Sequence, residues 1–538
     1  MHIELKKDEN DMHNRKNLRN TLPNRQTSRL YPAVLLMILL FCTFTTLIQG
    51  IPALSALPRG VIVCGCVCLF LASCGVMLFL HCRHKLTEDR TVFFLIFWGM
   101  LFHSCYVLLS GLYDRQHDEG VYTGIATAQI NPGHIGYIEY IYKFRRLPDI
   151  HPYQLFSYYH PPLHYALSGL WLIFLTSLGM AEDLAFENLQ VLPLFYSGLF
   201  MLLTCRILKK TNAEGKGLYA GLLLVCTHPA LTIMSGSINN DMLSSVLLAC
   251  AILAALCWLR EKTLPNLLLI ALSIGFGMLC KINTAVIALP VGLLFLMDFI
   301  GTIRTKEKPE ILRSVRNYIL FGCTAGSIGL CWIARNLIRF HVKPGISSST
   351  EDSVMYTGNY GLWARLGLPS LSDWHFDFPF HPLSGDAIHN TWVIMFQTSL
   401  FTEEYPTLLT GLPLLLCRIA YITAILSAVS SALLFFIVQY VKWKKGTKET
   451  GCEVIFLSTG YLGFLLSFAL FAVKYPYTCS SDFRYIVICL IYIAVGLADS
   501  ERLYSDTGFM GICSRIIRLG VCATLILMTV VYLSWGQW

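Results

Sequence analysis

Charged residues are scarce in this sequence of 538 residues, of which only 14% are Asp, Glu, Lys or Arg, whereas 55% are hydrophobic. A soluble globular protein cannot bury that much apolar surface, so the composition excludes a soluble enzyme or binding protein. No soluble domain, internal repeat or low-complexity tract is found, and no small-residue cleavage site follows the first apolar segment, which argues against a cleaved signal peptide. The net charge of +8 does not indicate nucleic-acid binding, because membrane proteins gather Lys and Arg in cytoplasmic loops.

Long apolar runs recur from residue 31 onwards, and each is long enough to cross a hydrocarbon core of about 30 Å. Because backbone groups in lipid must be paired within the chain, these runs predict helices and an all-α polytopic membrane protein. The candidate spans are 31–50, 59–81, 93–112, 162–180, 189–207, 217–235, 242–259, 264–280, 284–301, 317–335, 411–440, 453–473, 484–499 and 516–534.

Basic segments between the spans predict the orientation of the chain. They are "HCRHK" (81–85), "RILKKT" (206–211), "LREK" (259–262), "RTKEKPEILRSVR" (304–316) and "VKWKKGTK" (441–448). If these segments are cytoplasmic, two apolar segments, 162–180 and 189–207, lie where parity allows one or three. Either one segment is re-entrant or "RILKKT" breaks the rule, and about 13 complete crossings result.

Three further segments complete the predicted organisation of the chain. Residues 1–30 are polar and basic and are interpreted as a disordered cytoplasmic tail, followed by one integral membrane domain over 31–538. In 113–161, Ile and Tyr recur at helical spacing beside basic residues, which predicts interfacial helices in the first large outer loop. Residues 341–408 exceed ordinary loop length and predict an outer subdomain or substrate lid; its Trp374, Phe376, Phe378 and Phe380 either stack on sugar or rest on lipid.

Most of the conspicuous polar groups fall on the predicted extracytoplasmic face. They are Asp118 and Glu119, Tyr159, His160 and His164 in "YYHPPLHY" (158–165), Asn240 and Asp241 in "INND" (238–241), Lys281, Arg335, and Asp482 with Arg484 in "SSDFRY". Cations hold phosphate oxygens and stabilise a charged leaving group, and a carboxylate takes the proton from an incoming hydroxyl. The set therefore predicts a reaction on a lipid-linked phosphate at this face.

The order of these motifs resembles the GT-C superfamily of membrane glycosyltransferases. The likeness is strongest to the branch of glycosyltransferase family 39 type that contains protein O-mannosyltransferases and the lipid A aminoarabinose transferase. It rests on "HDEGVY" (117–122), "YYHPPLHYAL" (158–167), "NND" (239–241), "MLCKINTAVIALP" (278–290), "CWIARN" (331–336) and "DFRYIVICL" (482–490), and it covers most of residues 90–500.

The resemblance implies a GT-C-like bundle and an inverting enzyme that uses a polyprenyl-phosphate-linked sugar on the extracytoplasmic face. It makes Asp118 the general base, and Glu119 the residue that orients it or contacts the acceptor. The sequence departs from the family at His160, where relatives often carry Lys, and in having two extra spans before the acidic pair. A protonated His can replace Lys as a phosphate contact.

Each candidate residue also has a purely structural interpretation. Asp118 and Glu119 can be solvated loop residues, and Asn240 with Asp241 can cap the following helix. Lys281 can snorkel and Arg335 can anchor a helix at the headgroups. Arg484 can pair with Asp482. His160 and His164 are four residues apart and suit a metal site on one helix face, although a pair without ligands is favoured.

Three classes of function remain open on sequence alone. The leading hypothesis is an integral plasma-membrane glycosyltransferase that moves a hexosyl or pentosyl group to a hydroxyl on a lipid, protein or cell-wall glycan. A transporter or lipid flippase predicts ionisable residues near the midplane and pseudo-symmetric halves, neither of which is evident. The third is a non-catalytic glycan-assembly subunit. No cofactor is firmly predicted, a divalent metal ion is left open, and no nucleic-acid partner is expected.

Overall fold

The computed structural model describes residues 27–112, 131–305, 307–344, 355–380, 388–402, 409–504 and 508–535. Within these ranges the chain is helical and forms no β-strand; a single antiparallel bridge joins Tyr356 and Tyr477. The prediction of an all-α polytopic membrane protein is confirmed. The predicted tail at 1–30 lies mostly outside the described residues, as do Asp118 and Glu119.

Ten helices of the described chain are long and apolar enough to cross a membrane, or eleven when one bent pair is counted as a span. The ten are α2 (Thr27–Gly50), α4 (Arg59–Cys82), α5 (Glu88–Leu109), the run α8 (Glu182–Glu187), η1 (Asn188–Gln190) and α9 (Val191–Lys210), α12 (Asp241–Arg260), η2 (Ile282–Ile287) with α14 (Ala288–Thr305), α15 (Lys308–Phe340), α18 (Gly411–Lys445), α19 (Lys448–Lys474) and α21 (Phe509–Trp535). The bent pair joins η3 (Thr478–Ser481) and η4 (Phe483–Ile486) to α20 (Cys489–Leu503) at 45°. The remaining helices are α3 (Pro52–Ser55), α6 (Gly133–Phe144), α7 (Leu163–Ser177), α10 (Gly215–Thr227), α11 (Pro229–Met234), α13 (Leu264–Cys280), α16 (Leu362–Leu366) and α17 (Thr391–Phe401).

Contacts between the basic segments place several of them at the same end of the bundle. Lys209 Nζ lies 2.5 Å from Asp89 Oδ1, which ties α9 to the start of α5. The Arg260 guanidinium donates to the carbonyl of Lys210, and Lys262 pairs with Asp298. We call this end of the bundle the basic end, and the opposite end the site end.

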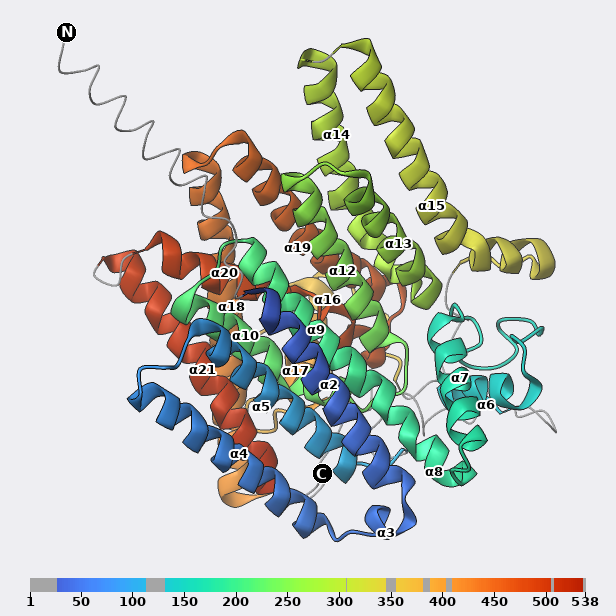
Figure 1. Cartoon of the computed structure of the whole chain (residues 1–538), viewed down its shortest axis with the longest axis vertical. Helices are drawn as coiled ribbons and strands as arrows, with labels where there is room; N and C mark the ends of the chain where they lie inside the picture. The colour runs from blue at the N-terminus through green and yellow to red at the C-terminus, as the bar shows by residue number, and fades with distance from the viewer. Residues whose placement is uncertain are drawn as a thin grey trace.

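Helix α7 has both of its ends at the site end, which resolves the parity problem. Near its start, His164 hydrogen-bonds the carbonyl of Ile238, and beyond its end Met180 packs against Gly50, the last residue of α2. The prediction of a crossing at 162–180 is therefore wrong: the segment is a helix of 15 residues that begins and ends on the same side. In Figure 1, α6, α7 and α8 form a group beside the main bundle.

Two shorter helical segments run between the two ends. The Gly215 N–H at the start of α10 donates to Glu88 at the basic end, with a distance of 2.9 Å, and α11 leads to the site end. Pro229 breaks this segment because the residue before a proline, His228, is extended (φ −67°, ψ 128°). Helix α13, the second of the two segments, ends at Lys281, which lies at the site end. Neither α10 nor α13 is long enough to be counted among the ten or eleven candidate spans of the described chain, which are fewer than the about 13 crossings predicted from the sequence.

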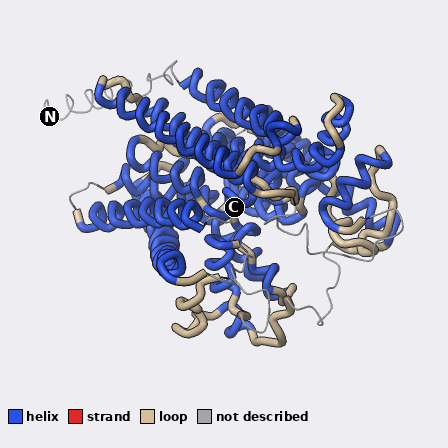
Figure 2. Tube along the Cα trace, turned by 90° about the horizontal axis from the view of Figure 1, so that it is seen from below, coloured by secondary structure: helices blue, strands red, loops and turns tan. Residues whose placement is uncertain are grey.

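Residues 355–380 and 388–402 form a small subdomain at the site end. The Thr357 N–H donates to the carbonyl of Pro476 (2.8 Å), next to the end of α19. The ring of Phe376 packs against the bundle, 6.0 Å from that of Tyr421 in α18. The ring of Phe380 packs within the subdomain, 4.7 Å from that of Phe401 in α17. Figure 2 shows the more extensive loop segments, in tan, at the bottom and right of the helical bundle, with shorter ones elsewhere.

Small residues allow α10 and α20 to approach closely. A Cβ added at Gly217 would lie 2.9 Å from the Cα and carbonyl oxygen of Ala498, and one at Gly221 would lie 3.0 Å from the carbonyl oxygen of Ala494. Both glycines lie four residues apart on one helix face, the spacing at which small residues let membrane helices pack.

Substitution of Gly217 by leucine is therefore expected to force α10 and α20 apart and to destabilise the protein by about 1–3 kcal/mol. Thermal unfolding of the purified protein in detergent measures the effect. Gly322→Leu in α15 is the matched control, since a Cβ there meets no atom within 4 Å. Equal melting temperatures for the two variants would contradict the packing.

Candidate functional site

Asp241 lies at the centre of a buried charged cluster. It is the first residue of α12, where the helix dipole favours a negative charge. Its N–H donates to the side-chain oxygen of Asn239 (3.0 Å), and its side chain is only 5% exposed. A buried carboxylate of this kind is stable only when cations or hydrogen-bond donors compensate it.

Two cations from distant parts of the sequence reach this carboxylate. Lys281, at the end of α13, hydrogen-bonds one oxygen of Asp241, and its Nζ lies 4.4 Å from the centre of the Tyr485 ring. Arg484 in η4 places Nε 3.8 Å from the other oxygen. The structure thus brings Asp241, Lys281 and Arg484 together, and Lys281 is paired inside the protein instead of snorkelling.

Asp482 and Asn240 fix the backbone around this cluster. An oxygen of Asp482 accepts a hydrogen bond from the N–H of Arg484 (2.7 Å) and so caps η4. Asn240 occupies the cap position of α12, but its side chain donates to the carbonyl of Cys280 (2.8 Å) and joins α12 to α13. Both residues therefore position the charged side chains beside them.

Arg335, near the end of α15, holds the loop that follows α6. It donates to the carbonyl of Pro148 (2.6 Å) and to the side-chain oxygen of Asn336 (2.8 Å), and lies 3.5 Å from Asp149. Its guanidinium also lies over the ring of Trp332 at 4.2 Å. Because the side chain is 24% exposed, it is the more accessible of the predicted arginines.

A pocket separates the element that carries Lys281 from the element that carries Arg335. The side chains and loops that line it come from the loop before α7, from η2 and from the end of α15: Pro152, Tyr153, Tyr159, Ile282, Trp332, Ile333, Asn336, Val342, Lys343 and Pro344. The indole N–H of Trp332 is buried and has no hydrogen-bond partner in the described part of the chain. The pocket is thus bordered by predicted phosphate-binding elements on two sides.

Stacked rings from α6, α7 and the loop between them contact Tyr159 and His160 and so fix their positions. The Tyr137 ring lies 4.2 Å from that of Tyr165, at an angle of 8°. His134 hydrogen-bonds the Tyr165 hydroxyl (2.7 Å), and its ring stacks on His160 at 5.5 Å. Burial raises the pKa of Tyr137, and the nearby positive charge of Arg335 opposes that shift. We call these rings the aromatic stack; the half-buried His160 lies at one end of it.

His160 and His164 do not converge on a common point. His164 is fully buried and bonded to the Ile238 carbonyl, whereas His160 lies against Tyr159, with the two ring centres 4.4 Å apart. Among the residues that the structure describes, no group of three metal-ligating side chains is found.

Asp118 and Glu119 lie outside the described residues, but both flanks of their segment are placed. The Leu112 N–H donates to Glu187 Oε2 (3.1 Å), and the carbonyl of Asn131 accepts a hydrogen bond from the Tyr158 hydroxyl (2.9 Å). The segment that carries the acidic pair therefore leaves and re-enters the described structure at the site end.

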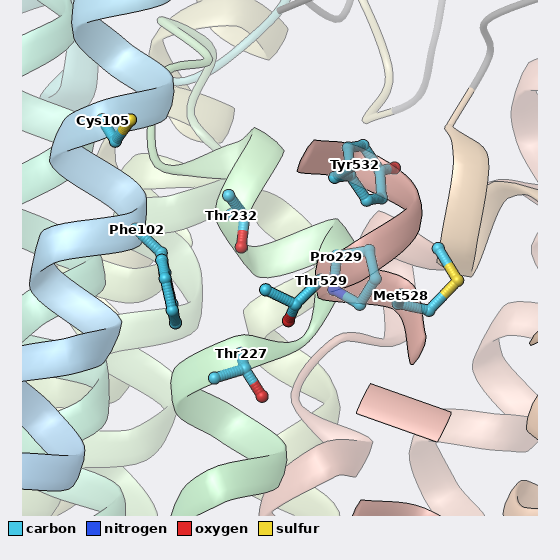
Figure 3. A pocket seen from close by; sticks show the side chains of 8 residues that line it. All are labelled: Phe102, Cys105, Thr227, Pro229, Thr232, Met528, Thr529 and Tyr532. Atoms are coloured by element: carbon cyan, nitrogen blue, oxygen red, sulfur yellow. The ribbon is translucent and has the colours of Figure 1, made fainter. Parts of the chain in front are cut away.

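An apolar crevice elsewhere in the bundle is a different kind of site. It lies where α10 breaks into α11, and Figure 3 shows its lining: Phe102, Cys105, Thr227, Pro229, Thr232, Met528, Thr529 and Tyr532. None of these side chains is Lys, Arg, Asp or Glu. The crevice suits hydrocarbon and offers nothing that would hold a phosphate.

Comparisons with known proteins agree with the motifs. Residues 160–312 match the family model described as dolichyl-phosphate-mannose-protein mannosyltransferase. This segment contains His160, Asp241 and Lys281. The resemblance to GT-C membrane glycosyltransferases is thereby confirmed, and glycosyl transfer is the class of reaction that the match supports.

Two crystal structures of an Archaeoglobus fulgidus oligosaccharyltransferase are among the solved structures that resemble this chain. One carries a tethered acceptor peptide with an NVT sequon (14% identity, TM-score 0.41), and the other contains zinc and sulfate (10% identity, TM-score 0.32). The matches cover 81% and 82% of this chain, but only 55% and 49% of the oligosaccharyltransferase chains. A comparison with curated proteins found no match.

The sequence did not single out several residues that build the site. Tyr485 contacts both Lys281 and Arg484, Trp332 lies between Arg335 and the pocket, and His134 orders the aromatic stack. Tyr485 and Trp332 are within the motifs "DFRY" and "CWIARN", so their proximity to the cations was a usable signal. Nothing in the sequence near His134 marks it.

Proposed function

We propose that this protein is an inverting glycosyltransferase that takes a sugar from a polyprenyl-phosphate-linked donor and passes it to a hydroxyl acceptor on the extracytoplasmic face. The observation that carries the proposal is the convergence of Lys281 and Arg484 on Asp241. Ile282, the residue after Lys281, and Trp332 and Asn336 of α15 line one pocket. The match of residues 160–312 to a dolichyl-phosphate-mannose-protein mannosyltransferase family supports the same class of donor.

Charge placement explains what the cations do. Asp241 pairs with Lys281 and lies 3.8 Å from Arg484, so it compensates the two cations in part when no ligand is bound. A donor phosphate bound beside this pocket adds a new anion, which Arg335 and His160 contact. As the bond from the sugar to the phosphate breaks, charge grows on the phosphate oxygens, and cations already in place stabilise it.

Asp118 acts as the general base in this proposal. It takes the proton of the acceptor hydroxyl while the hydroxyl oxygen attacks the anomeric carbon from the side opposite the phosphate, which inverts that carbon. Glu119 orients Asp118 or contacts the acceptor. Tyr159, Asn240 and Asp241 position the sugar or the groups around it. His164 supports them through its hydrogen bond to the carbonyl of Ile238, in the segment before Asn240.

Incubation of the purified protein with a panel of polyprenyl-phosphate sugars tests the proposal. Release of polyprenyl phosphate, measured by mass spectrometry, is expected for at least one hexosyl or pentosyl donor when a hydroxyl acceptor is present. Movement of intact donor across a vesicle membrane without release would indicate a flippase instead. Binding of the donor with neither outcome would indicate a non-catalytic subunit.

Substitution of His160 tests whether its position contacts the donor phosphate. His160→Phe keeps a flat ring in the stack but removes the nitrogens, so the KM for the donor is expected to rise about 3–10-fold, the loss of one charge-assisted hydrogen bond. His160→Lys restores a permanent cation and is expected to keep the KM at or below the wild-type value. An unchanged KM in His160→Phe would remove His160 from the donor site.

A further inference from the structure

The subdomain at the site end exposes an apolar surface within residues 361–371. The nearest partly exposed acidic residue along the chain is Asp373, which bonds the N–H of Ser370. Within residues 361–371, Trp363 is 80% exposed and Leu368 is 89% exposed, and Leu362 and Leu371 are also largely exposed. The only charged residue in this stretch, Arg365, is buried. We call the four exposed side chains, Leu362, Trp363, Leu368 and Leu371, the apolar ledge.

The backbone of the ledge is firmly held from its other side. Arg365 donates to the carbonyls of Ala472 and Val473 at the end of α19. The amide of Asn390 donates to the carbonyls of Ala364 (3.2 Å) and Gly367 (3.1 Å), and the Trp392 indole donates to that of Leu366 (2.7 Å). These hydrogen bonds hold the backbone in place and direct the ledge side chains outward. Their exposure therefore does not come from a frayed end of the chain.

The hydrogen bonds from Arg365 to Ala472 and Val473 place the ledge at the level where α19 ends. Leu462, Leu466 and Leu470 are exposed at intervals of four residues and so form one outward stripe along α19. The next residue at this interval is the exposed Lys474, whose Nζ lies 5.2 Å from the centre of the Tyr475 ring. A basic and an aromatic residue at the end of an apolar stripe are typical of a membrane boundary.

We propose that the apolar ledge is embedded in the lipid leaflet at the site end, at the boundary between headgroups and acyl chains. Continuity with the lipid-facing stripe of α19, the absence of exposed charge within residues 361–371, and the presence of Trp363 all favour lipid as the occupant. The subdomain is then fixed to the bilayer as well as to the bundle. This assignment concerns the membrane alone and holds whatever reaction the protein catalyses.

Fluorine NMR of the full-length protein in nanodiscs tests this assignment. Tryptophans are replaced by 5-fluorotryptophan, and the signal of Trp363 is identified by its loss in Trp363→Phe. Two paramagnetic probes are compared: a phospholipid with a nitroxide at carbon 5 of an acyl chain, and a water-soluble gadolinium chelate. We expect the lipid probe to broaden the Trp363 signal more than the gadolinium chelate does.

An internal control and a second variant make the outcome decisive. Trp392, assigned through Trp392→Phe, is partly buried and should respond weakly to both probes. In the variant Leu368→Glu/Leu371→Glu, two charges oppose insertion, so broadening of the Trp363 signal by the lipid probe should fall at least twofold. Stronger broadening by the gadolinium chelate would show that the ledge faces water. No broadening by either probe would show that protein covers it, from a second copy or a partner, and either result overturns the assignment.

Discussion

Replacement of Asp118 by asparagine is expected to lower kcat for sugar transfer about 10²–10⁴-fold, because the acceptor hydroxyl loses its general base. The donor KM should stay within about threefold of the wild-type value, since the phosphate is held by cations and not by this carboxylate. Initial rates of polyprenyl phosphate release at saturating donor measure both quantities.

Asp373→Asn is a suitable control for this substitution. Asp373 lies in the subdomain at the site end and bonds the N–H of Ser370 (2.8 Å), and it has no part in the proposed chemistry. Its kcat should be unchanged. A wild-type kcat in Asp118→Asn, with an unchanged melting temperature, would show that Asp118 is not the general base. The proposal that the protein transfers a sugar would still stand.

Replacement of Asp241 by alanine is expected to destabilise the protein by about 3–5 kcal/mol, because it leaves Lys281 and Arg484 buried without the carboxylate between them. Thermal unfolding of the purified protein in nanodiscs measures the loss. The double variant Asp241→Ala/Lys281→Met removes one of the uncompensated cations together with the anion, so it should be more stable than the single variant.

The comparison of the single and double variants separates the charge pair from general packing. A double variant as unstable as Asp241→Ala, or less stable, would mean that Lys281 and Asp241 do not depend on each other. Thr284→Ala is a useful control, because Thr284 lies next to the same turn and bonds the Lys281 carbonyl (2.7 Å) but carries no charge. Its effect should be about 1 kcal/mol.

Most of the helical architecture could be predicted from the sequence because apolar run length is a direct physical requirement for a membrane span. Helices α18 and α19 cover the predicted spans 411–440 and 453–473. The segment 162–180 was the exception. Its composition suits a span, but its two ends contact Ile238 and Gly50 on the same side, and tertiary contacts of this kind are not encoded in hydropathy.

The candidate site was predictable in part. The motifs placed Asp241, Lys281 and Arg484 on one face, and the structure brings them into contact. Their mutual pairing could not be predicted, because a sequence that suits a phosphate site equally suits a self-compensated ion cluster. Neither of the two alternatives, stacking on sugar or resting on lipid, describes Phe380, whose side chain is fully buried and packs within the subdomain.

The position of the bound donor phosphate is the most direct test of the proposed site. A polyprenyl phosphate with a diazirine in the isoprene unit next to the phosphate is photoactivated on the purified protein, and its adducts are mapped by mass spectrometry. If the proposed site is correct, adducts are expected within residues 149–160, 281–285, 332–340 and 482–485. Adducts confined to the basic end, at 206–211 or 259–262, would place the phosphate on the opposite side of the bundle and contradict the proposed site.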